Sequence, residues 1–150
     1  MASNLFYRIV VPTDFSDCSE EAWALAKRVA GTLRSEVVLA HVFVEPILYG
    51  DPPLAADSAG QLYEQGRKWV EEELEKWASA ARVQGMTVRT IVRTGSAHEE
   101  IVNLATDERA ELIIIGTHGR TGLNRLLVGS VAERVIRFAP CPVLTVRKPE

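Results

Sequence analysis

The chain has only two cysteines among its 150 residues, Cys18 and Cys141, and neither has a metal-ligand neighbour at Cys-x-x-Cys or histidine spacing. A pair so far apart in the sequence excludes the disulfide framework of a small secreted domain. We expect both to be reduced thiols with a structural or neutral role. No apolar run approaches the ~18 residues of a membrane span, and the first residues lack the basic start and apolar centre of a secretory signal. A cytoplasmic protein with no membrane partner is expected.

Strong charge of one sign is also absent. Lysine and arginine number 17 against 20 aspartates and glutamates, which gives a net charge of −3. A protein that grips the backbone of DNA or RNA usually carries a basic block, and none is present here, so nucleic acid is not an expected partner. Hydrophobic residues make up 47% of the chain, enough at this length for the core of one ordinary domain. We expect one domain over residues 1–150.

Two widespread glycine-rich nucleotide signatures are missing. A P-loop needs Gly-x-x-x-x-Gly-Lys-Ser/Thr, and a dinucleotide fold needs Gly-x-Gly-x-x-Gly near its first strand. Neither a Ser-His-Asp triad nor a Walker-type set can be recognised. The sequence contains a different pattern, in which Gly116-x-x-Gly119 is followed, after nine residues, by Gly129-Ser130. This segment follows the apolar run 112–115 and leads into a helical pattern.

Glycines spaced in this way can bring backbone N–H groups close to an anion. They lack a Cβ and tolerate positive φ, so Gly116, Gly119 and Gly129 are expected to leave room that a side chain would fill. Ser130-Val-Ala-Glu133 has the pattern of a capping box, which would aim the first N–H groups of the next helix at the loop. Arg120 adds positive charge. The segment is a candidate phosphate cradle, although each glycine taken alone is equally typical of a turn.

Five apolar runs alternate with helical patterns, which is typical of β-α-β units and a parallel sheet. The runs predict strands at 6–11, 37–44, 88–92, 112–115 and 143–146. Apolar residues at three- and four-residue steps predict helices at 17–33, 61–81, 96–105 and 130–138. Asp17 and Ser96 are the expected caps of the first and third helices. Trp69 and Trp77 are expected to be core or interface anchors. Residues 45–60, rich in proline and glycine, predict a long irregular connection, either a lid or variable surface.

These motifs together resemble the universal stress protein family, specifically its ATP-binding branch. The spacing Gly-x2-Gly-x9-Gly-Ser is that branch's phosphate motif. Residues 9–16, Ile-Val-Val-Pro-Thr-Asp-Phe-Ser, resemble the family's first strand and its acidic turn, and residues 139–146 resemble its closing strand. The resemblance covers nearly the whole chain. It implies an α/β fold like that of the adenine-nucleotide alpha hydrolases, with a doubly wound, five-stranded parallel sheet in the order 3-2-1-4-5 and helices on both faces.

The same resemblance implies a binding site for ATP. Asp14 at the end of the first strand would contact the nucleoside, although its own chemistry is equally that of a turn residue. The backbone near Val42 would contact adenine, whereas His41 is expected to be a packed strand histidine. A Mg²⁺ ion bridging the phosphates would be held by nucleotide and water more than by protein carboxylates. The expected nucleotide-contacting residues are Pro12, Thr13, Asp14, Val42, Ile115, Gly116, His118, Gly119, Arg120, Gly129, Ser130 and Val131.

The function that the resemblance implies is a cytoplasmic, ATP-binding switch or binding module of the stress response. Its nucleotide occupancy would alter its shape or its affinity for an unidentified regulatory protein, with slow hydrolysis at most. An alternative is an ATP-hydrolysing or adenylyl-transferring enzyme on the same fold, using His118 or Asp14. A phosphoacceptor domain like a response regulator is disfavoured, because residues 93–95 after the third strand are Arg-Thr-Gly and contain no acceptor aspartate.

The last strand predicts a contact with a second copy. It is short, apolar and last in the implied strand order, and an open apolar edge invites pairing. Family members commonly dimerise through this strand, so the resemblance implies a homodimer joined by Val143–Val146. The alternative is a monomer in which Pro142 and the charged tail protect the edge.

Overall fold

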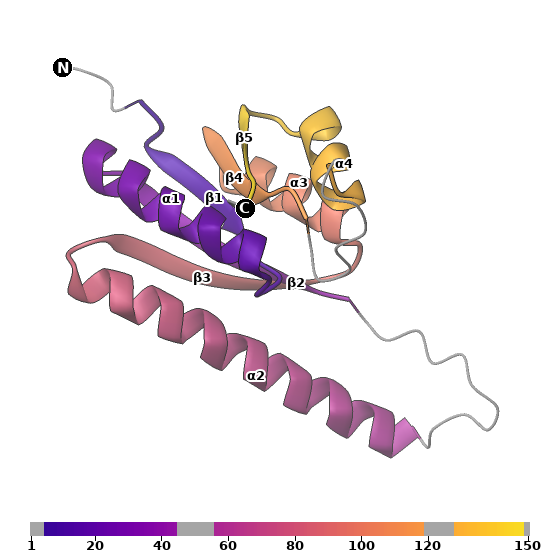
Figure 1. The fold of residues 1–150 in the computed structure, drawn as a ribbon. Helices are drawn as coiled ribbons and strands as arrows, with labels where there is room; N and C mark the ends of the chain where they lie inside the picture. The colour runs from indigo at the N-terminus through magenta and orange to yellow at the C-terminus, as the bar shows by residue number, and fades with distance from the viewer. Residues whose placement is uncertain (1–4, 45–55, 119–127, 149–150) are drawn as a thin grey trace.

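The protein alternates strictly between strand and helix. The computed structural model describes residues 5–44, 56–118 and 128–148. Within these ranges the elements are β1 (Arg8–Pro12), α1 (Asp17–Leu33), β2 (Glu36–Phe43), α2 (Ala56–Val83), β3 (Thr87–Thr94), α3 (Ala97–Asp107), β4 (Leu112–Gly116), α4 (Ser130–Phe138) and β5 (Val143–Val146). All strand pairs are parallel, in the order β3-β2-β1-β4-β5, which confirms the implied fold (Figure 1).

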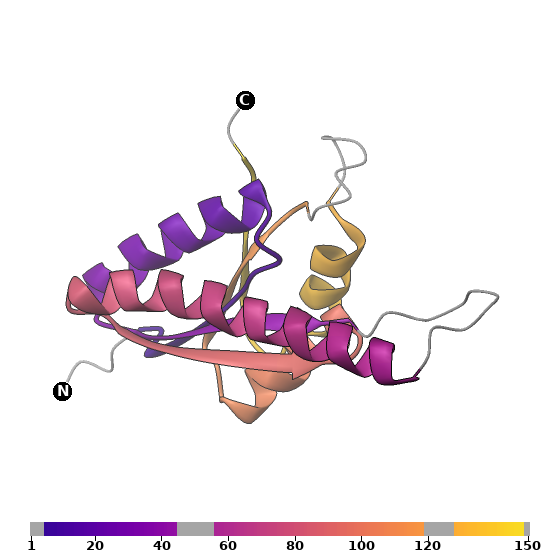
Figure 2. The ribbon, with the colours of Figure 1, turned by 90° about the horizontal axis from the view of Figure 1, so that it is seen from below.

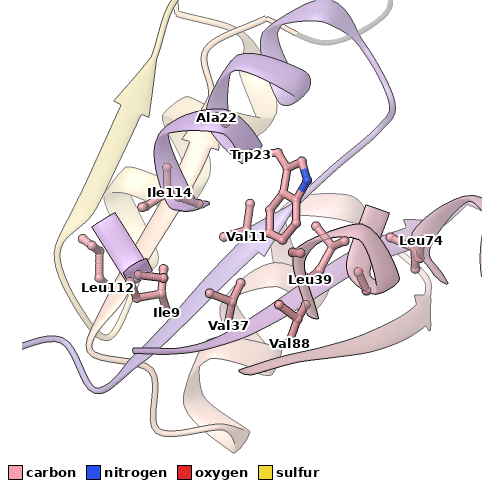
Figure 3. Packing of buried hydrophobic residues seen from close by; sticks show 14 of the residues in the cluster. Ile9, Val11, Ala22, Trp23, Val37, Leu39, Leu74, Val88, Leu112 and Ile114 are labelled. Atoms are coloured by element: carbon pink, nitrogen blue, oxygen red, sulfur yellow. The ribbon is translucent and has the colours of Figure 1, made fainter. Parts of the chain in front are cut away.

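Two cores lie on opposite faces of this sheet because successive strand residues point in opposite directions. One face carries Ile9 and Val11 of β1, which pack with residues of α1 and α2. Figure 3 shows Trp23 of α1 and Leu74 of α2 over this layer. The other face carries Val10, which packs with residues of α3 and α4. Strands buried on both faces explain the unbroken apolar runs in the sequence.

The strand order reverses its direction at β1: β2 and β3 lie on one side of it, and β4 and β5 lie on the other. This strand pairs with β2, where Val10 is opposite Val38, and also with β4, where Val10 is opposite Ile113. The connections through α1 and α2 cover one face, whereas those through α3 and α4 cover the other. In open α/β sheets the carboxyl ends of the strands at such a switch point form a crevice where ligands bind. The fold therefore places the ends of β1 and β4 side by side.

The helix α2 is longer than its apolar pattern predicts. It starts at Ala56, so residues 56–60 of the expected irregular connection are helical and that part of the prediction is wrong. Gly60 lies within the helix; glycine costs about 1 kcal/mol relative to alanine there but does not by itself end a helix. Residues 45–55, the rest of the expected connection, lie outside the described residues. Both views show the N-terminal end of α2 reaching beyond the sheet (Figures 1 and 2).

Two of the expected helix caps differ in the structure. Ser16 caps α1, because its hydroxyl accepts a hydrogen bond from the N–H of Ser19 at 3.3 Å, and Asp17 is the first helical residue. Ser96 occupies the N-cap position of α3, but its side chain makes no capping hydrogen bond and instead contacts Nδ1 of His98 at 3.1 Å. A serine one position earlier competes with aspartate equally well as a cap, which is why the pattern misplaced the first one.

Ion pairs join the elements at the amino ends of the strands. The Glu36 carboxylate accepts hydrogen bonds from Nε of Arg89 at 2.6 Å and from Nε of Arg8 at 2.9 Å. Arg89 also reaches Glu108 at 2.5 Å. The hydrogen bond from Arg89, supported by Arg8, holds the pKa of the Glu36 carboxyl below its ordinary value although burial acts to raise it. This network ties β1, β2, β3 and the end of α3 together, at the end of the sheet away from the crevice.

Candidate functional site

A cavity of 530 Å³ lies at the carboxyl ends of the central strands. The ends of β1, β2 and β4 form its floor, and the first turns of α3 and α4 form its sides. Every expected site residue that the structure describes lines it: Pro12, Thr13, Asp14, Val42, Ile115, Gly116, His118, Gly129, Ser130 and Val131. The other two expected residues, Gly119 and Arg120, lie outside the described residues.

The turn after β1 carries the acidic group of the cavity. Thr13 is buried; its N–H donates to the carbonyl of Ala40 at 2.8 Å and its hydroxyl donates to Ser19 at 2.9 Å. Oδ1 of Asp14 accepts a hydrogen bond from the N–H of Ser16 at 3.0 Å. This is the turn chemistry open to an aspartate at this position. A carboxylate has about four acceptor sites, so this bond is compatible with hydrogen bonds to a ligand.

The histidine of β2 is held from two sides. Nδ1 of His41 lies 2.7 Å from the carbonyl oxygen of Thr13, and because a carbonyl only accepts, Nδ1 carries the proton. The His41 ring is stacked on Phe15 with 5.2 Å between ring centroids. These contacts agree with the expected packed strand histidine. The neighbouring wall of the cavity is apolar and includes Val42, Ile101 and Ile115, a surface suited to a flat aromatic base.

Packing within the protein requires two glycines of the cavity. A Cβ at Gly129 would lie 2.7 Å from the carbonyl oxygen of Thr117, and a Cβ at Gly116 would lie 2.8 Å from the carbonyl carbon of Cys18. The φ of Gly129 is −61°, and Gly116 is not among the positive-φ residues. Close approach between chain segments therefore requires both glycines. That they also keep space clear for a ligand stays a prediction.

The first turn of α4 faces the cavity. Gly129 is the N-cap and Ser130 is the first helical residue, so the predicted capping box does not form; the N–H of Glu133 donates to the carbonyl of Gly129 instead. The N–H of Gly129 donates to Thr117 at 2.6 Å and belongs to the protein's own hydrogen bonding. The N–H groups of Ser130 and Val131 lie in the turn that has no acceptors within the helix. With the helix dipole they make this end attractive to an anion.

His118 sits between the strand end and this helix. Its Nδ1 lies 2.9 Å from the hydroxyl of Thr117, and its carbonyl accepts a hydrogen bond from Ser16 at 3.4 Å. Sequence reasoning missed Thr117, which is buried, lines the cavity and joins three segments: its N–H donates to Val146 and its carbonyl accepts from Gly129. The one feature of the sequence that could have pointed to Thr117 is its position immediately after Gly116, the last residue of β4. The apolar lining residues Ala97 and Ala132 gave no such signal.

Neither thiol forms a disulfide. Cys141 is partly buried against the α3–α4 core, and burial raises the pKa of its thiol, which disfavours the reactive thiolate. Within residues 5–44, 56–118 and 128–148, no three side chains of histidine, cysteine, aspartate or glutamate gather in a way that could hold a metal ion. In the same ranges, no helix is long and apolar enough to cross a membrane.

Comparison with known proteins relates the sequence and the fold to one family. The sequence model of the universal stress protein family matches residues 6–147. The chain belongs to this family. A universal stress protein of Methanocaldococcus jannaschii, MJ0531, is 41% identical over 147 residues, which cover 98% of this chain and 85% of that protein. A second one from the same organism, MJ0577, is 34% identical and covers 97% of this chain and 98% of its own length.

Solved structures of universal stress proteins share the architecture. That of MJ0577 superimposes with a TM-score of 0.84 at 32% sequence identity, over 97% of this chain and 99% of its own. The structure of UspA from Lactobacillus plantarum has a TM-score of 0.83 at 21% identity, over 97% of this chain and 100% of its own. The second likeness is one of fold alone, because the sequences have diverged so far.

Proposed function

We propose that this universal stress protein binds ATP in the cavity and acts as a nucleotide-dependent dimeric switch in the stress response. The observation that carries the proposal is the pairing of an apolar wall with a helix N-terminus in one cavity of 530 Å³. A volume of this order suits a small-molecule ligand. Asp14 lies in the same cavity, where its carboxylate would accept hydrogen bonds from ribose hydroxyls or the adenine amino group.

Related structures support an adenine nucleotide as the ligand. A universal stress protein from Archaeoglobus fulgidus was solved in complex with dAMP, and another universal stress protein in complex with cAMP. They share this fold at 23% and 24% sequence identity. Both ligands combine adenine with phosphate. In this chain the adenine would lie against Val42 and Ile115, and the phosphates would lie against the N–H groups of Ser130 and Val131, with a Mg²⁺ ion held chiefly by phosphate and water.

The proposed dimer uses β5. The two edge strands of the sheet are β3 and β5. The first of them, β3, carries Arg89 and Arg93, and charged side chains on an edge strand discourage pairing with another chain. The other edge, β5, carries no charged side chain from Val143 to Val146: three of its four residues are aliphatic, Thr145 is the fourth, and Leu144 is 39% exposed. Since Val146 accepts a hydrogen bond from Thr117, a residue of the cavity wall, β5 has a direct connection to the nucleotide site. Nucleotide occupancy would thereby influence dimer affinity.

Slow hydrolysis at most is part of the proposal. Fast turnover needs a general base or nucleophile positioned beside the terminal phosphate. The titratable side chains that line the cavity in the described residues are Asp14, His41 and His118, and each has a hydrogen bond within the protein. The competing function, an ATP-consuming enzyme, is favoured by the position of His118 near the first turn of α4. Multiple-turnover phosphate release that disappears in His118→Ala, with ATP affinity intact, would establish that enzyme instead.

A negative charge added at the first turn of α4 tests the phosphate assignment. Replacing Ser130 with glutamate does not weaken the helix, since acidic residues stabilise a first turn, but it places a negative charge where the phosphates would bind. We expect calorimetry to show ATP affinity falling about tenfold to hundredfold in Ser130→Glu. Ser130→Gln, of the same size without charge, should retain ATP binding, and adenosine should bind all three proteins alike. Equal ATP affinity in both variants would refute the assignment.

A further inference from the structure

Phe15 has an unusual backbone conformation. Its φ is 60°, in the left-handed region that L-residues other than glycine, asparagine and aspartate seldom adopt, at a cost of roughly 1–2 kcal/mol. Two hydrogen bonds enclose it: its own N–H donates to the hydroxyl of Thr13, and the N–H of Ser16 donates to Asp14, each at 3.0 Å. The strained residue, Phe15, directly follows Asp14, whose carboxylate lies in the cavity. Such strain persists where its surroundings hold it, and it often marks a functional turn.

The ring of Phe15 lies at the centre of an aromatic cluster. It stacks on His41 and makes edge contacts with Trp69 at 5.3 Å and Trp77 at 5.5 Å between ring centroids. Trp77 in turn stacks on Trp23 at 6.3 Å. All three tryptophans of the chain thus belong to one cluster, which joins the turn after β1 to α1 and α2. These contacts agree with the expected role of Trp69 and Trp77 as packing anchors.

The N-terminal half of α2 packs against Phe15 and Phe43. Trp69 of this half is 46% exposed and meets Phe15. Tyr63 packs against Phe43 at 5.0 Å between centroids, and a Cβ at Gly66 would lie 3.0 Å from the Phe43 ring. Phe15 and Phe43 each follow a residue expected to contact the nucleotide, Asp14 and Val42. The N-terminal half of α2, whose end reaches beyond the sheet (Figures 1 and 2), is therefore supported by two phenylalanines. Phe43 lines the cavity, and Phe15 directly follows Asp14.

We propose that Phe15 couples occupancy of the cavity to the N-terminal half of α2. The coupling rests on the proposed function. A ligand that hydrogen-bonds to Asp14 pulls on the carboxylate that also accepts from the N–H of Ser16. The shift of that carboxylate loosens the turn that holds Phe15 in its strained conformation. Relief of the strain moves the Phe15 ring and loosens its contacts with Trp69. The two states differ in the φ of Phe15 and in the packing of α2, and ATP selects between them by its different affinity for each.

Tryptophan emission and amide hydrogen exchange on ATP titration test this coupling in the full chain. In the wild type we expect the emission to change with the same midpoint as calorimetric binding, and exchange of residues 62–70 to quicken about threefold or more. Trp69→Phe should remove most of the emission change. Phe15→Leu should bind ATP within about tenfold of the wild-type affinity yet lose both responses. Leu62→Ala, on the same helix face two turns earlier and 57% exposed, is the matched control and should keep both.

The outcomes separate the coupling from the function on which it rests. ATP binding by calorimetry without any change in α2 exchange would overturn the coupling and leave the proposed function standing. Responses that persist unchanged in Phe15→Leu would also overturn it. Absence of ATP binding would overturn both. If Phe15→Leu does not fold, the wild-type exchange of residues 62–70 decides, since the coupling predicts a change there and a passive helix shows none.

Discussion

The carbonyl oxygen of Thr117 accepts a hydrogen bond from the N–H of Gly129 at 2.6 Å, and a Cβ on Gly129 would lie 2.7 Å from the same oxygen. This hydrogen bond joins the N-cap of α4 to the residue that follows β4. It positions the helix N-terminus over the cavity, and it explains why the residue at 129 has to be glycine. The end of α4 that we propose binds phosphate is thus placed by contact between two backbone segments.

Substitution of Gly129 is expected to weaken both folding and binding. In Gly129→Val the side chain cannot fit against Thr117 unless α4 moves, so we expect a loss of about 1–3 kcal/mol in the free energy of unfolding by urea. ATP affinity should fall about tenfold or more by calorimetry, because the displaced helix no longer aims its N–H groups at the phosphates. Gly31→Ala is the control: a Cβ there meets nothing within 4 Å, and alanine should stabilise α1 by about 0.5–1 kcal/mol. Wild-type affinity and stability in Gly129→Val would contradict this geometry.

The ion pairs of Glu36 predict a pH dependence of stability. Because the folded pKa of Glu36 lies below its ordinary value of 4.5, its contribution is present above that value and is lost as pH falls through the folded pKa. We expect the free energy of unfolding to fall more steeply between about pH 5 and pH 3 in the wild type than in Glu36→Gln.

The control for this pH experiment is Glu64→Gln, at an exposed carboxylate of α2. It should follow the wild-type curve, whereas Glu36→Gln should already be destabilised by about 1–3 kcal/mol at pH 7 through loss of charged hydrogen bonds. If the free energy of unfolding fell equally steeply with pH in all three proteins, the ion pairs of Glu36 would make no contribution to the loss of stability in acid.

A charge in β5 should separate the proposed dimer. Leu144→Arg places a guanidinium in the middle of the apolar edge, where burial against a second copy would cost several kcal/mol, roughly the price of an unpaired buried ion. Size-exclusion chromatography with light scattering should give a dimer mass for the wild type and a monomer mass for Leu144→Arg. Val83→Arg, at an 89% exposed position at the end of α2, should remain dimeric. A monomer mass for the wild type at micromolar concentration would rule out the dimer.

Much of the fold follows from simple patterns in the sequence. The strand 112–115 was predicted correctly because four consecutive aliphatic residues are buried on both faces of a parallel sheet. The strand order came from the resemblance to the family, since apolar periodicity does not specify which strands are neighbours. The start of α2 was predicted five residues late, because Gly60 was taken as a turn signal although the helix passes through it.

The candidate site was predictable at its strand ends and less so at its helix. Asp14 and Gly116 end apolar runs, and their proximity follows from the switch point. The prediction of a capping box at Ser130 was wrong. The same sequence is compatible with Gly129 as the N-cap and Ser130 as the first helical residue, and the structure has that arrangement. The aromatic cluster around Phe15 gave no local signal, because its rings come from α1, β2, α2 and the turn after β1 and meet only in the folded chain.

The most direct test of the proposed function asks whether a small molecule copurifies with the protein. The wild type, purified without added nucleotide, is denatured and the released compounds are identified by mass spectrometry, alongside calorimetric titration of the emptied protein with ATP. We expect an adenine nucleotide in the released fraction and saturable ATP binding that is weakened in Ser130→Glu. No released adenine nucleotide, together with no heat of binding at millimolar ATP, would contradict the proposed function.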